Sequence, residues 1–229
     1  MLAHYRGGLI EDLFRAFSSP DLIEIVALTL RVTGVALIVA TLLGVPLGAL
    51  IGLTKFRGKG VVRAVLYTGM GLPPVVVGLF VYLALSRSGP LGSLEWLFTP
   101  NAMIAAQAII ALPLTMGLTM TSVESVNPEL RRQIVALGAT SAQTAWTTLH
   151  EARIGVTAAI VAAFGGIISE VGAVMLVGGN IAGQTRVLTT AIVLETRQGD
   201  FSLALALGVI LVAITFIVNA ALIRLQSRG

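Results

Sequence analysis

Five long stretches of this 229-residue chain carry almost no charged side chain. They cover approximately 25–53, 62–86, 102–124, 154–178 and 201–224. Because a helix needs about 20 consecutive apolar residues to cross the hydrocarbon core of a bilayer, each stretch is long enough to span a membrane. Charged residues make up 11% of the chain, against about 25% in soluble domains, so little polar surface is left to face water. The pattern predicts an all-α integral membrane protein, a single transmembrane domain over residues 1–229 with five transmembrane helices.

The rest of the composition excludes several kinds of site. The chain has no cysteine, which excludes disulfides and zinc–thiolate sites, and His4 and His150 are too far apart in sequence to suggest a metal site. The 15 basic residues outnumber the 11 acidic ones, as cytoplasmic loops of membrane proteins commonly require, so the excess does not indicate nucleic-acid binding. We expect no metal or cofactor in this chain. The charges within residues 1–24 argue against a cleaved signal peptide.

The loops between the stretches predict the orientation. Residues 54–63 contain Lys55, Arg57, Lys59 and Arg63 and no acidic residue, which is typical of a cytoplasmic loop. With five crossings, the N-terminus then lies outside and the C-terminus lies in the cytoplasm. The polar segment 124–153 falls on the cytoplasmic side as well. We therefore expect a multi-pass protein of the plasma membrane.

Two shorter segments have helical patterns of their own. Residues 8–18 place Leu9, Leu13 and Phe17 on one face, the spacing of a short amphipathic helix. This helix either meets an external partner or anchors the chain at the membrane surface, and we favour the anchor. The apolar run 187–194 is too short to span, so we expect an interfacial or re-entrant helix there.

Glycine and proline mark places where helices approach closely or break. Gly44, Gly48 and Gly52 share one helical face and permit close backbone contact, either within the chain or between two copies; we favour the contact within the chain. Pro73 and Pro74 predict a break midway through the second stretch. Irregular backbone at that depth is tolerated only where it faces protein or a water-filled path, so the break is a candidate pathway lining.

The segment 127–151 has the pattern of two short amphipathic helices joined at a glycine. Asn127–Pro128 is typical of a helix start, Gly138 is placed to end the first helix in a left-handed conformation, and either residue of Thr140–Ser141 can cap the second helix. The apolar faces of both helices need a cover. Either a soluble cytoplasmic partner with Trp146 as anchor or the protein's own helix ends would supply it, and we favour the partner.

Arg31, Glu124 and Glu170 are the candidates for ionisable side chains at membrane depth, where charge is costly. Glu124 is close enough to the cytoplasmic end to reach water, and Arg31 is close enough to the external face to do so. Glu170 lies deep in the fourth stretch. We expect it to be structural, either accepting hydrogen bonds from backbone amides at a helix break or pairing with Arg31 beside a gate.

The external segment 178–190 is rich in glycine and contains Asn180 and Arg186. Exposed backbone amides in glycine-rich turns can bind oxyanions, and Arg186 adds a positive charge. The alternative is a plain loop that supports the short helix at 187–194. The residues do not decide between the two.

Three segments resemble the permease subunits of tungstate ABC transporters, which are akin to the molybdate and sulfate permeases. They are MGLPPVVVGLFVYLALSRSGPLG (70–92), ISEVGAVMLVGGNIAGQTRVLTTAIVLET (168–196) and GDFSLALALG (199–208). The segment 127–151 resembles the coupling loop of ABC importer permeases at Gly138. It departs from that pattern at Arg132, where the family has glutamate, and at His150–Glu151, where it has Leu-Pro.

The resemblance implies a Type I importer fold in which two copies of this chain form the pore and act by alternating access. Two cytoplasmic ATPase subunits would bind the 127–151 loops, and an external solute-binding protein would deliver the oxyanion: tungstate, or alternatively molybdate or sulfate. This chain has no phosphate-binding loop, so we expect no enzyme activity in it, with ATP and magnesium held by the ATPase. The residues implied for ATPase coupling are Arg131, Arg132, Ala136, Leu137, Gly138, Ala139 and Trp146. Those implied for the translocation path or gate are Pro73, Pro74, Glu170, Gly172, Asn180 and Arg186.

Two other classes of function fit less well. An ATP-independent secondary transporter or channel would need polar coupling sites at mid-membrane and often has internal repeats, but only Glu170 qualifies and no repeat is evident. A membrane-embedded enzyme would need clustered acids, histidines or a nucleophile–base pair, and His150–Glu151 is the one adjacent pair of that kind. The importer permease is the favoured function, and the secondary transporter or channel is the alternative.

Overall fold

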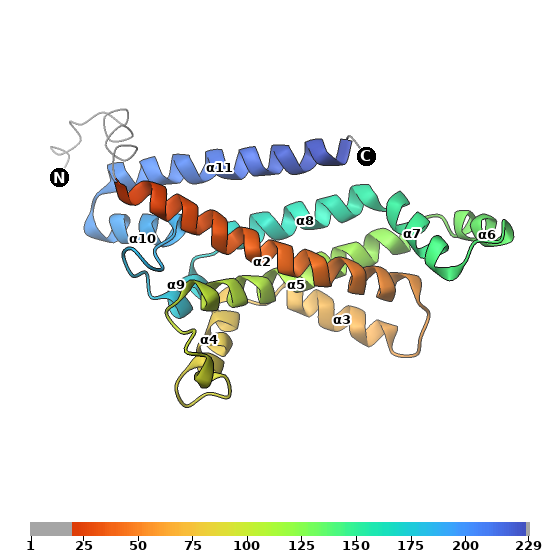
Figure 1. Ribbon diagram of the computed structural model, residues 1–229, viewed down its shortest axis with the longest axis horizontal. Helices are drawn as coiled ribbons and strands as arrows, with labels where there is room; N and C mark the ends of the chain where they lie inside the picture. Colours follow the sequence, from red (N-terminus) through yellow and green to blue (C-terminus); the bar gives the residue numbers. More distant parts are fainter. Residues whose placement is uncertain (1–19, 228–229) are drawn as a thin grey trace. The chain divides into compact units, whose positions relative to one another are not determined.

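The computed structural model describes residues 20–227, and every regular element in that range is a helix. Figure 1 shows their course. In chain order they are α2 (Pro20–Leu53), α3 (Lys59–Met70), α4 (Pro74–Leu85), the short 3-10 helix η1 (Gly92–Leu94), α5 (Pro100–Glu124), α6 (Pro128–Ala136), α7 (Ser141–Glu151), α8 (Arg153–Ile168), α9 (Gly172–Gly178), α10 (Leu188–Gln198) and α11 (Phe201–Ser227). The amphipathic helix predicted over 8–18 lies outside the described residues.

Three helices, α2, α5 and α11, are long and apolar enough to cross a membrane on their own. Two neighbouring pairs, α3 with α4 and α7 with α8, reach that length only together, and each pair is bent at a short break. The described residues therefore hold three candidate spans by length and composition, or up to five if each bent pair counts as one.

The second and fourth apolar stretches are each divided into two helices. In the second, Pro73 is extended and Pro74 occupies the first turn of α4, where its missing N–H costs nothing. The predicted break at these prolines is confirmed. The fourth stretch, predicted as a span over 154–178, is not one helix, because α8 ends at Ile168 and α9 begins at Gly172. The side chains of Glu170, Gln107 and Thr189 bind backbone groups at this break and so stabilise it.

Packing divides the described residues into two compact units. The first holds residues 20–36, 73–107 and 167–220, and the second holds 37–72, 108–166 and 221–227. Four helices, α2, α5, α8 and α11, continue from one unit into the other.

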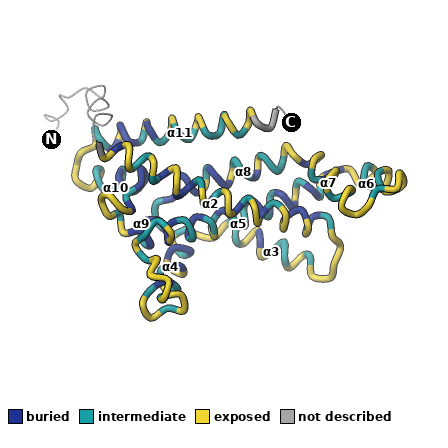
Figure 2. The backbone as a smooth tube through the Cα atoms, viewed as in Figure 1, coloured by how far each residue is buried: buried dark blue, intermediate teal, exposed yellow. Residues whose placement is uncertain are grey.

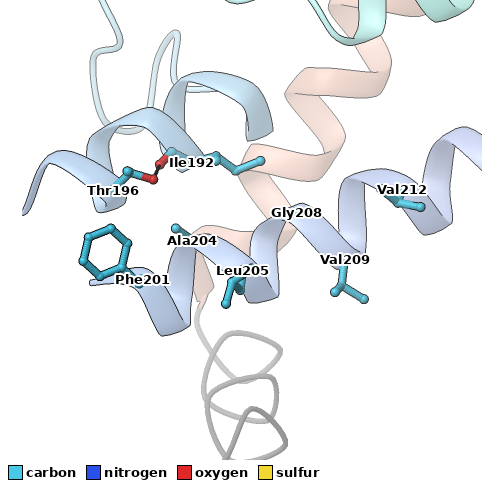
Figure 3. Close-up of a pocket in the computed structure, with 8 residues that line it drawn as sticks. All are labelled: Ile192, Thr196, Phe201, Ala204, Leu205, Gly208, Val209 and Val212. Carbon is cyan, nitrogen blue, oxygen red and sulfur yellow. Dashed lines mark hydrogen bonds between the residues drawn. The ribbon is translucent and has the colours of Figure 1, made fainter. Parts of the chain in front are cut away.

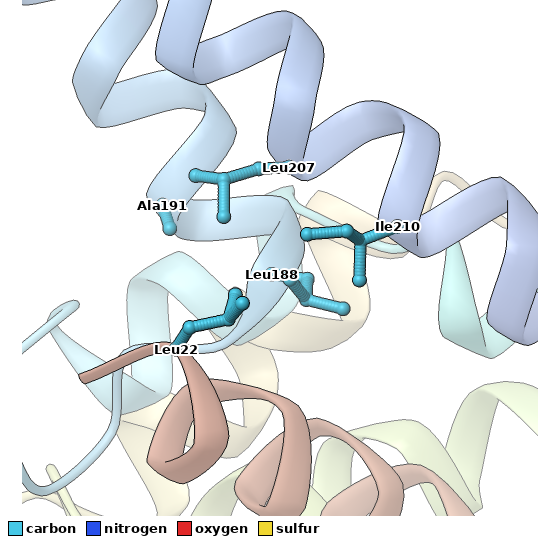
Figure 4. Close-up of a cluster of buried hydrophobic side chains, with 5 residues drawn as sticks. All are labelled: Leu22, Leu188, Ala191, Leu207 and Ile210. Carbon is cyan, nitrogen blue, oxygen red and sulfur yellow. The ribbon is translucent and has the colours of Figure 1, made fainter. Parts of the chain in front are cut away.

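The first unit has an apolar core where the start of α2 meets α10 and α11. Leu22, Leu188, Ala191, Leu207 and Ile210 are buried together there, as Figure 4 shows. This arrangement fixes α10, which occupies the place of the short helix predicted over 187–194.

A second contact in this unit joins α4 to α9. A Cβ atom added at Gly78 would lie 2.5 Å from the Ala173 Cα, a distance that real Cβ contacts essentially never show. The two backbones therefore touch, and only glycine fits at this point of α4.

In the second unit, the glycine ladder of α2 packs against α5. A Cβ at Gly44 would overlap the Thr115 hydroxyl, and one at Gly48 would overlap the Met116 carbonyl oxygen. Thr115 Oγ1 also donates to the Ala40 carbonyl oxygen across this contact, at 3.0 Å. The ladder is thus used within the chain, as favoured from the sequence.

Helix α11 is buried only near its start. From residue 211 to Arg224 no residue is buried, as the yellow and teal tube in Figure 2 shows. Val212, Phe216 and Ile217 are 69%, 74% and 64% exposed. Large apolar side chains left open along a membrane helix contact lipid or another subunit.

Candidate functional site

The 127–151 loop has the local structure that its sequence predicts. Asn127 caps α6 by accepting a hydrogen bond from the Glu129 amide at 2.9 Å. Thr140, the first of the two candidates, caps α7 in a reciprocal pair with the Gln143 side chain. Gly138 has a φ of +86°, the left-handed conformation that glycine adopts at little cost. Two short helices joined at a glycine are confirmed.

One side of this loop packs on the protein, and the other side is open. Leu130 and Leu149 pack against a buried cluster formed by Ala49, Val123, Val126 and Ala152. By contrast, Leu137 is 88% exposed and Trp146 is 71% exposed. The protein's own helix ends therefore cover part of the apolar faces, and Leu137 and Trp146 leave an apolar surface for a partner.

The other residues predicted to contact the ATPase differ in their surroundings. Arg132, Ala136 and Gly138 are exposed, and Ala139 is half-buried. Arg132 forms an ion pair one turn along α6, with 3.0 Å between its Nη1 and Glu129 Oε2.

Arg131 is turned toward the protein itself. It is half-buried, and its Nη2 donates to the Val123 carbonyl oxygen at the end of α5, at 2.6 Å. The last carbonyl groups of a helix have no partner within the helix, so a cation there satisfies one of them. Arg131 thus ties α6 to α5.

Sequence reasoning missed an ion-pair cluster beside this tie. Glu124 was expected to reach water, but its carboxylate contacts two cations of α3. Lys59 Nζ lies 2.9 Å from Oε1, and Arg63 Nη2 lies 2.7 Å from Oε2. The i, i+4 spacing of Lys59 and Arg63 was visible in the sequence and places both on one helical face. No local pattern, however, connects α3 to a residue 61 positions away.

The break between α8 and α9 is held by side chains from several elements. Glu170 Oε1 accepts a hydrogen bond from the Ala173 amide at 2.8 Å, so the carboxylate satisfies an amide at the start of α9. Thr189 of α10 donates to the Glu170 carbonyl oxygen at 3.1 Å. Gln107 of α5 donates to the Ile167 carbonyl oxygen at 2.9 Å. Backbone groups freed by the break thus have partners, which allows the helix to stop in an apolar stretch.

Of the two partners expected for Glu170, the structure shows the backbone amide. Glu170 is 9% exposed, whereas Arg31 is exposed on α2, and the two form no ion pair. The carboxylate therefore holds a helix end in place.

The residues of the two broken stretches that were predicted to form the path or gate lie near one another. A Cβ at Gly172, the first residue of α9, would lie 3.3 Å from the Val75 Cβ in the first turn of α4. Val75 directly follows Pro73 and Pro74. The structure thus brings Pro73, Pro74 and Gly172 into one region with Glu170.

Asn180 and Arg186 lie at the other end of α9 from Glu170. Asn180 has a positive φ of 53° and follows Gly179 at 74°. Thr185 closes the turn by donating to the Gly178 carbonyl oxygen at 2.6 Å. The Arg186 amide donates to the Ile181 carbonyl oxygen at 3.1 Å, so both residues belong to this turn.

Arg186 faces acidic neighbours. It lines a small cavity of about 80 Å³ together with Asp21 and Glu24 of α2. Two carboxylates beside the cavity repel an anion, so the charges here weigh against an oxyanion site at Arg186.

A larger groove of about 620 Å³ lies between α10 and α11 (Figure 3). Phe201, Leu205 and Val209 line it, with no charged residue among the lining side chains. Its polar side chain, Thr196, donates its hydroxyl to the Ile192 carbonyl oxygen at 2.7 Å. An apolar groove of this kind offers nothing to balance the charge of an oxyanion. Within residues 20–227, no group of three or more His, Asp or Glu side chains is placed to hold a metal ion.

Comparison with known proteins identifies the family. Residues 44–228 match the family described as binding-protein-dependent transport system inner membrane component. The probable anion ABC transporter permease protein of Haloferax volcanii is 47% identical over 212 residues, covering 90% of this chain and 91% of that protein. The tungstate uptake system permease protein TupB of Peptoclostridium acidaminophilum is 42% identical and covers 91% of each chain. The molybdenum transport system permease protein ModB of Escherichia coli K12 is 28% identical, covering 85% of this chain and 89% of that protein.

Solved structures show the same fold at low identity. The crystal structure of a bacterial ABC transporter involved in import of the acidic polysaccharide alginate aligns with a TM-score of 0.77 at 20% identity, covering 95% of this chain and 83% of that chain. An amino acid ABC transporter aligns with a TM-score of 0.65 at 19% identity, covering 94% and 95%. The chain therefore belongs to the binding-protein-dependent transport system inner membrane components: it is a multi-pass ABC transporter permease, which works with a separate ATPase subunit and a solute-binding protein.

Proposed function

We propose that this chain is the permease of an ATP-driven oxyanion importer whose substrate is tungstate. The observation that carries the proposal is its 42% and 35% identity to two tungstate uptake permeases, from Peptoclostridium acidaminophilum and Campylobacter jejuni, across about nine-tenths of the chain. Identity to the Escherichia coli molybdenum permease is 28%. Molybdate is the alternative substrate, because both anions are tetrahedral dianions.

In this proposal two copies of the chain form the pore as a Type I importer with five spans in each copy. The N-terminus lies outside and the C-terminus in the cytoplasm, so the 127–151 loops meet two ATPase subunits. The exposed Leu137 and Trp146 are the apolar contacts to the ATPase. ATP and magnesium stay on the ATPase, and this chain holds no cofactor.

The gate of the proposed importer is the region of the two broken stretches. Pro73 directly precedes α4, Pro74 begins it, and Gly172 begins α9 against its first turn. Irregular backbone at this depth faces protein or a water-filled path, and such breaks let half-helices move as separate elements during alternating access. Because the Glu170 carboxylate is bonded to the α9 amide, we assign it to the shape of the gate and not to the anion. Asn180 and Arg186 belong to the external entrance, where a binding protein would dock.

The test of this function is uptake in proteoliposomes that contain the chain, its ATPase and its binding protein. Accumulation of tungstate that requires ATP and exceeds that of molybdate supports the proposal. A preference for molybdate would change the proposed substrate from tungstate to molybdate and would leave the class, an ATP-driven oxyanion importer, unchanged. Transport that proceeds without ATP or the ATPase overturns the importer and supports a secondary transporter or channel.

The ATPase contact has a matched pair of variants, because the chain has two tryptophans. Trp146→Ala should abolish co-purification of the ATPase with the permease. Trp96→Ala, in the segment proposed to be external, should leave it intact. Equal co-purification in both variants would show that Trp146 is not an anchor.

The orientation is testable by cysteine labelling, because the chain has no native cysteine. A membrane-impermeant maleimide applied to intact cells should label Ser93→Cys and should not label Arg57→Cys. The opposite labelling would reverse the proposed topology.

A further inference from the structure

The ends of four elements in the second unit meet at charged side chains. Glu124, the last residue of α5, contacts Lys59 and Arg63 of α3 at 2.9 and 2.7 Å. Lys59 Nζ also donates to the carbonyl oxygens of Gly52 and Thr54 at the end of α2, at 3.1 and 2.8 Å. One ammonium group thus joins α2, α3 and α5.

Arg131 connects α6 to the same place. Its guanidinium binds the carbonyl oxygen of Val123, the residue next to Glu124 in α5. The positive charge of Arg131 and the two cations of α3 therefore all act on the last turn of α5, where the helix dipole also favours cations. We call Lys59, Arg63, Glu124 and Arg131 the charged junction.

Helix α6 has few other attachments to the protein. None of its nine residues is buried, and it is tied at Leu130, which packs on the apolar cluster, and at Arg131. Beyond its C-terminal end lie Leu137 and Gly138, which are open to a partner. Besides its contact with α7, α6 is therefore joined to the long helices at Leu130 and Arg131.

On the α7 side, Leu149 packs on the same apolar cluster and Thr148 is fully buried. An apolar contact such as Leu130 or Leu149 allows sliding, since dispersion has no preferred direction. A hydrogen bond between a guanidinium and a carbonyl oxygen has a required geometry, and ion pairs held by several donors resist displacement. The charged junction is therefore the stiff part of the connection.

We propose that the charged junction transmits movement of α6 to α5, α3 and α2, so that its four side chains are positioning residues for the coupling of ATP hydrolysis to transport. This inference rests on the proposed function, because it assumes an ATPase on the 127–151 loop. It assigns to Arg131 a role inside the permease, where the sequence suggested an ATPase contact.

The test measures ATP hydrolysis and tungstate uptake on the same reconstituted complex. Glu124→Gln removes the charge and keeps the shape, and Arg131→Met keeps the apolar stem and removes the donors. Each variant should assemble with the ATPase and hydrolyse ATP, while uptake per ATP falls by about five- to 150-fold, the usual range of coupling between two sites. Arg131→Lys should restore part of the ratio, because lysine can still donate to the Val123 carbonyl oxygen.

Arg57→Gln is the matched control, since Arg57 is an exposed cation two residues before Lys59. It should keep the wild-type ratio. In the double variant Glu124→Gln with Arg131→Met, uptake per ATP should fall little further than in the more severe of the two single variants. The reason is that effects of residues in one connected network do not add.

The outcomes separate this inference from the proposed function. If the wild-type complex shows no ATP-driven uptake, the proposed function fails. If the wild type transports and both single variants keep its uptake per ATP, the junction does not transmit movement. If both variants fail to assemble with the ATPase, the junction is a structural clamp only, and the inference is also overturned.

Discussion

Replacing Gly48 by alanine should destabilise the protein far more than the same replacement at Gly34, on the same helix. A Cβ at Gly48 would overlap the Met116 carbonyl oxygen and lie 3.0 Å from the Thr119 Cβ. The carbonyl belongs to the backbone of α5 and cannot rotate away. A Cβ at Gly34 would meet nothing within 4 Å.

The expected loss follows from the overlap. To accept the methyl group, α2 and α5 must move apart, which also loosens the contact at Gly52, where a Cβ would lie 3.0 Å from the Met120 carbonyl oxygen. Overpacking of this kind costs about 1–3 kcal/mol, and with no flexible side chain to yield we expect about 2–3 kcal/mol for Gly48→Ala. Gly34→Ala should be neutral or stabilise the helix by up to about 1 kcal/mol, since alanine has the higher helix propensity.

The assay is unfolding of the purified protein in mixed micelles by increasing SDS, followed by helical circular dichroism. Both variants should unfold with the same slope, and the midpoint of Gly48→Ala should fall well below that of Gly34→Ala. If the two unfolding free energies agree within about 0.5 kcal/mol, a difference no larger than an ordinary surface substitution makes, the close contact between α2 and α5 does not exist as described.

The same unfolding assay checks three further contacts in the first unit. Gly78→Ala should cost about 1–3 kcal/mol, because the methyl group would meet the Ala173 backbone. Glu170→Gln should unfold like the wild type and keep uptake, since the amide oxygen can still accept from the Ala173 N–H. Glu170→Leu should lower the free energy of unfolding by about 1 kcal/mol, because the hydrogen bond at the start of α9 is lost. If both variants lose the same free energy of unfolding, the charge of Glu170 matters. Thr29→Val should cost about 1–3 kcal/mol, because it leaves the buried Leu188 N–H without its acceptor at 3.0 Å; no change would mean that another acceptor replaces it.

Local features of the fold were predictable because each depends on residues close in sequence. The caps at Asn127 and Thr140 and the left-handed Gly138 follow from side-chain chemistry within one turn of a helix. The break before α4 follows from Pro73 and Pro74. The spacing of the glycine ladder put three glycines on one face, although it did not name α5 as the partner.

The contacts around the candidate site were less predictable. The sequence suggested two roles for Glu170, and only the position of α9 shows that the carboxylate binds the Ala173 amide. The resemblance to ABC importer permeases implied Arg131 for coupling to the ATPase. The end of α5 offers it an unpaired carbonyl oxygen instead.

The class of the protein was settled by the apolar stretches, since their length and lack of charge leave no alternative to helices in a bilayer. Which side chains meet was decided by tertiary structure. Lys59 and Arg63 reach Glu124 across about 60 residues, and Gln107 reaches the Ile167 carbonyl oxygen over a similar separation. Such pairs form because a broken helix or a helix end leaves backbone and charged groups that need partners, and the nearest donor in space need not be near in sequence.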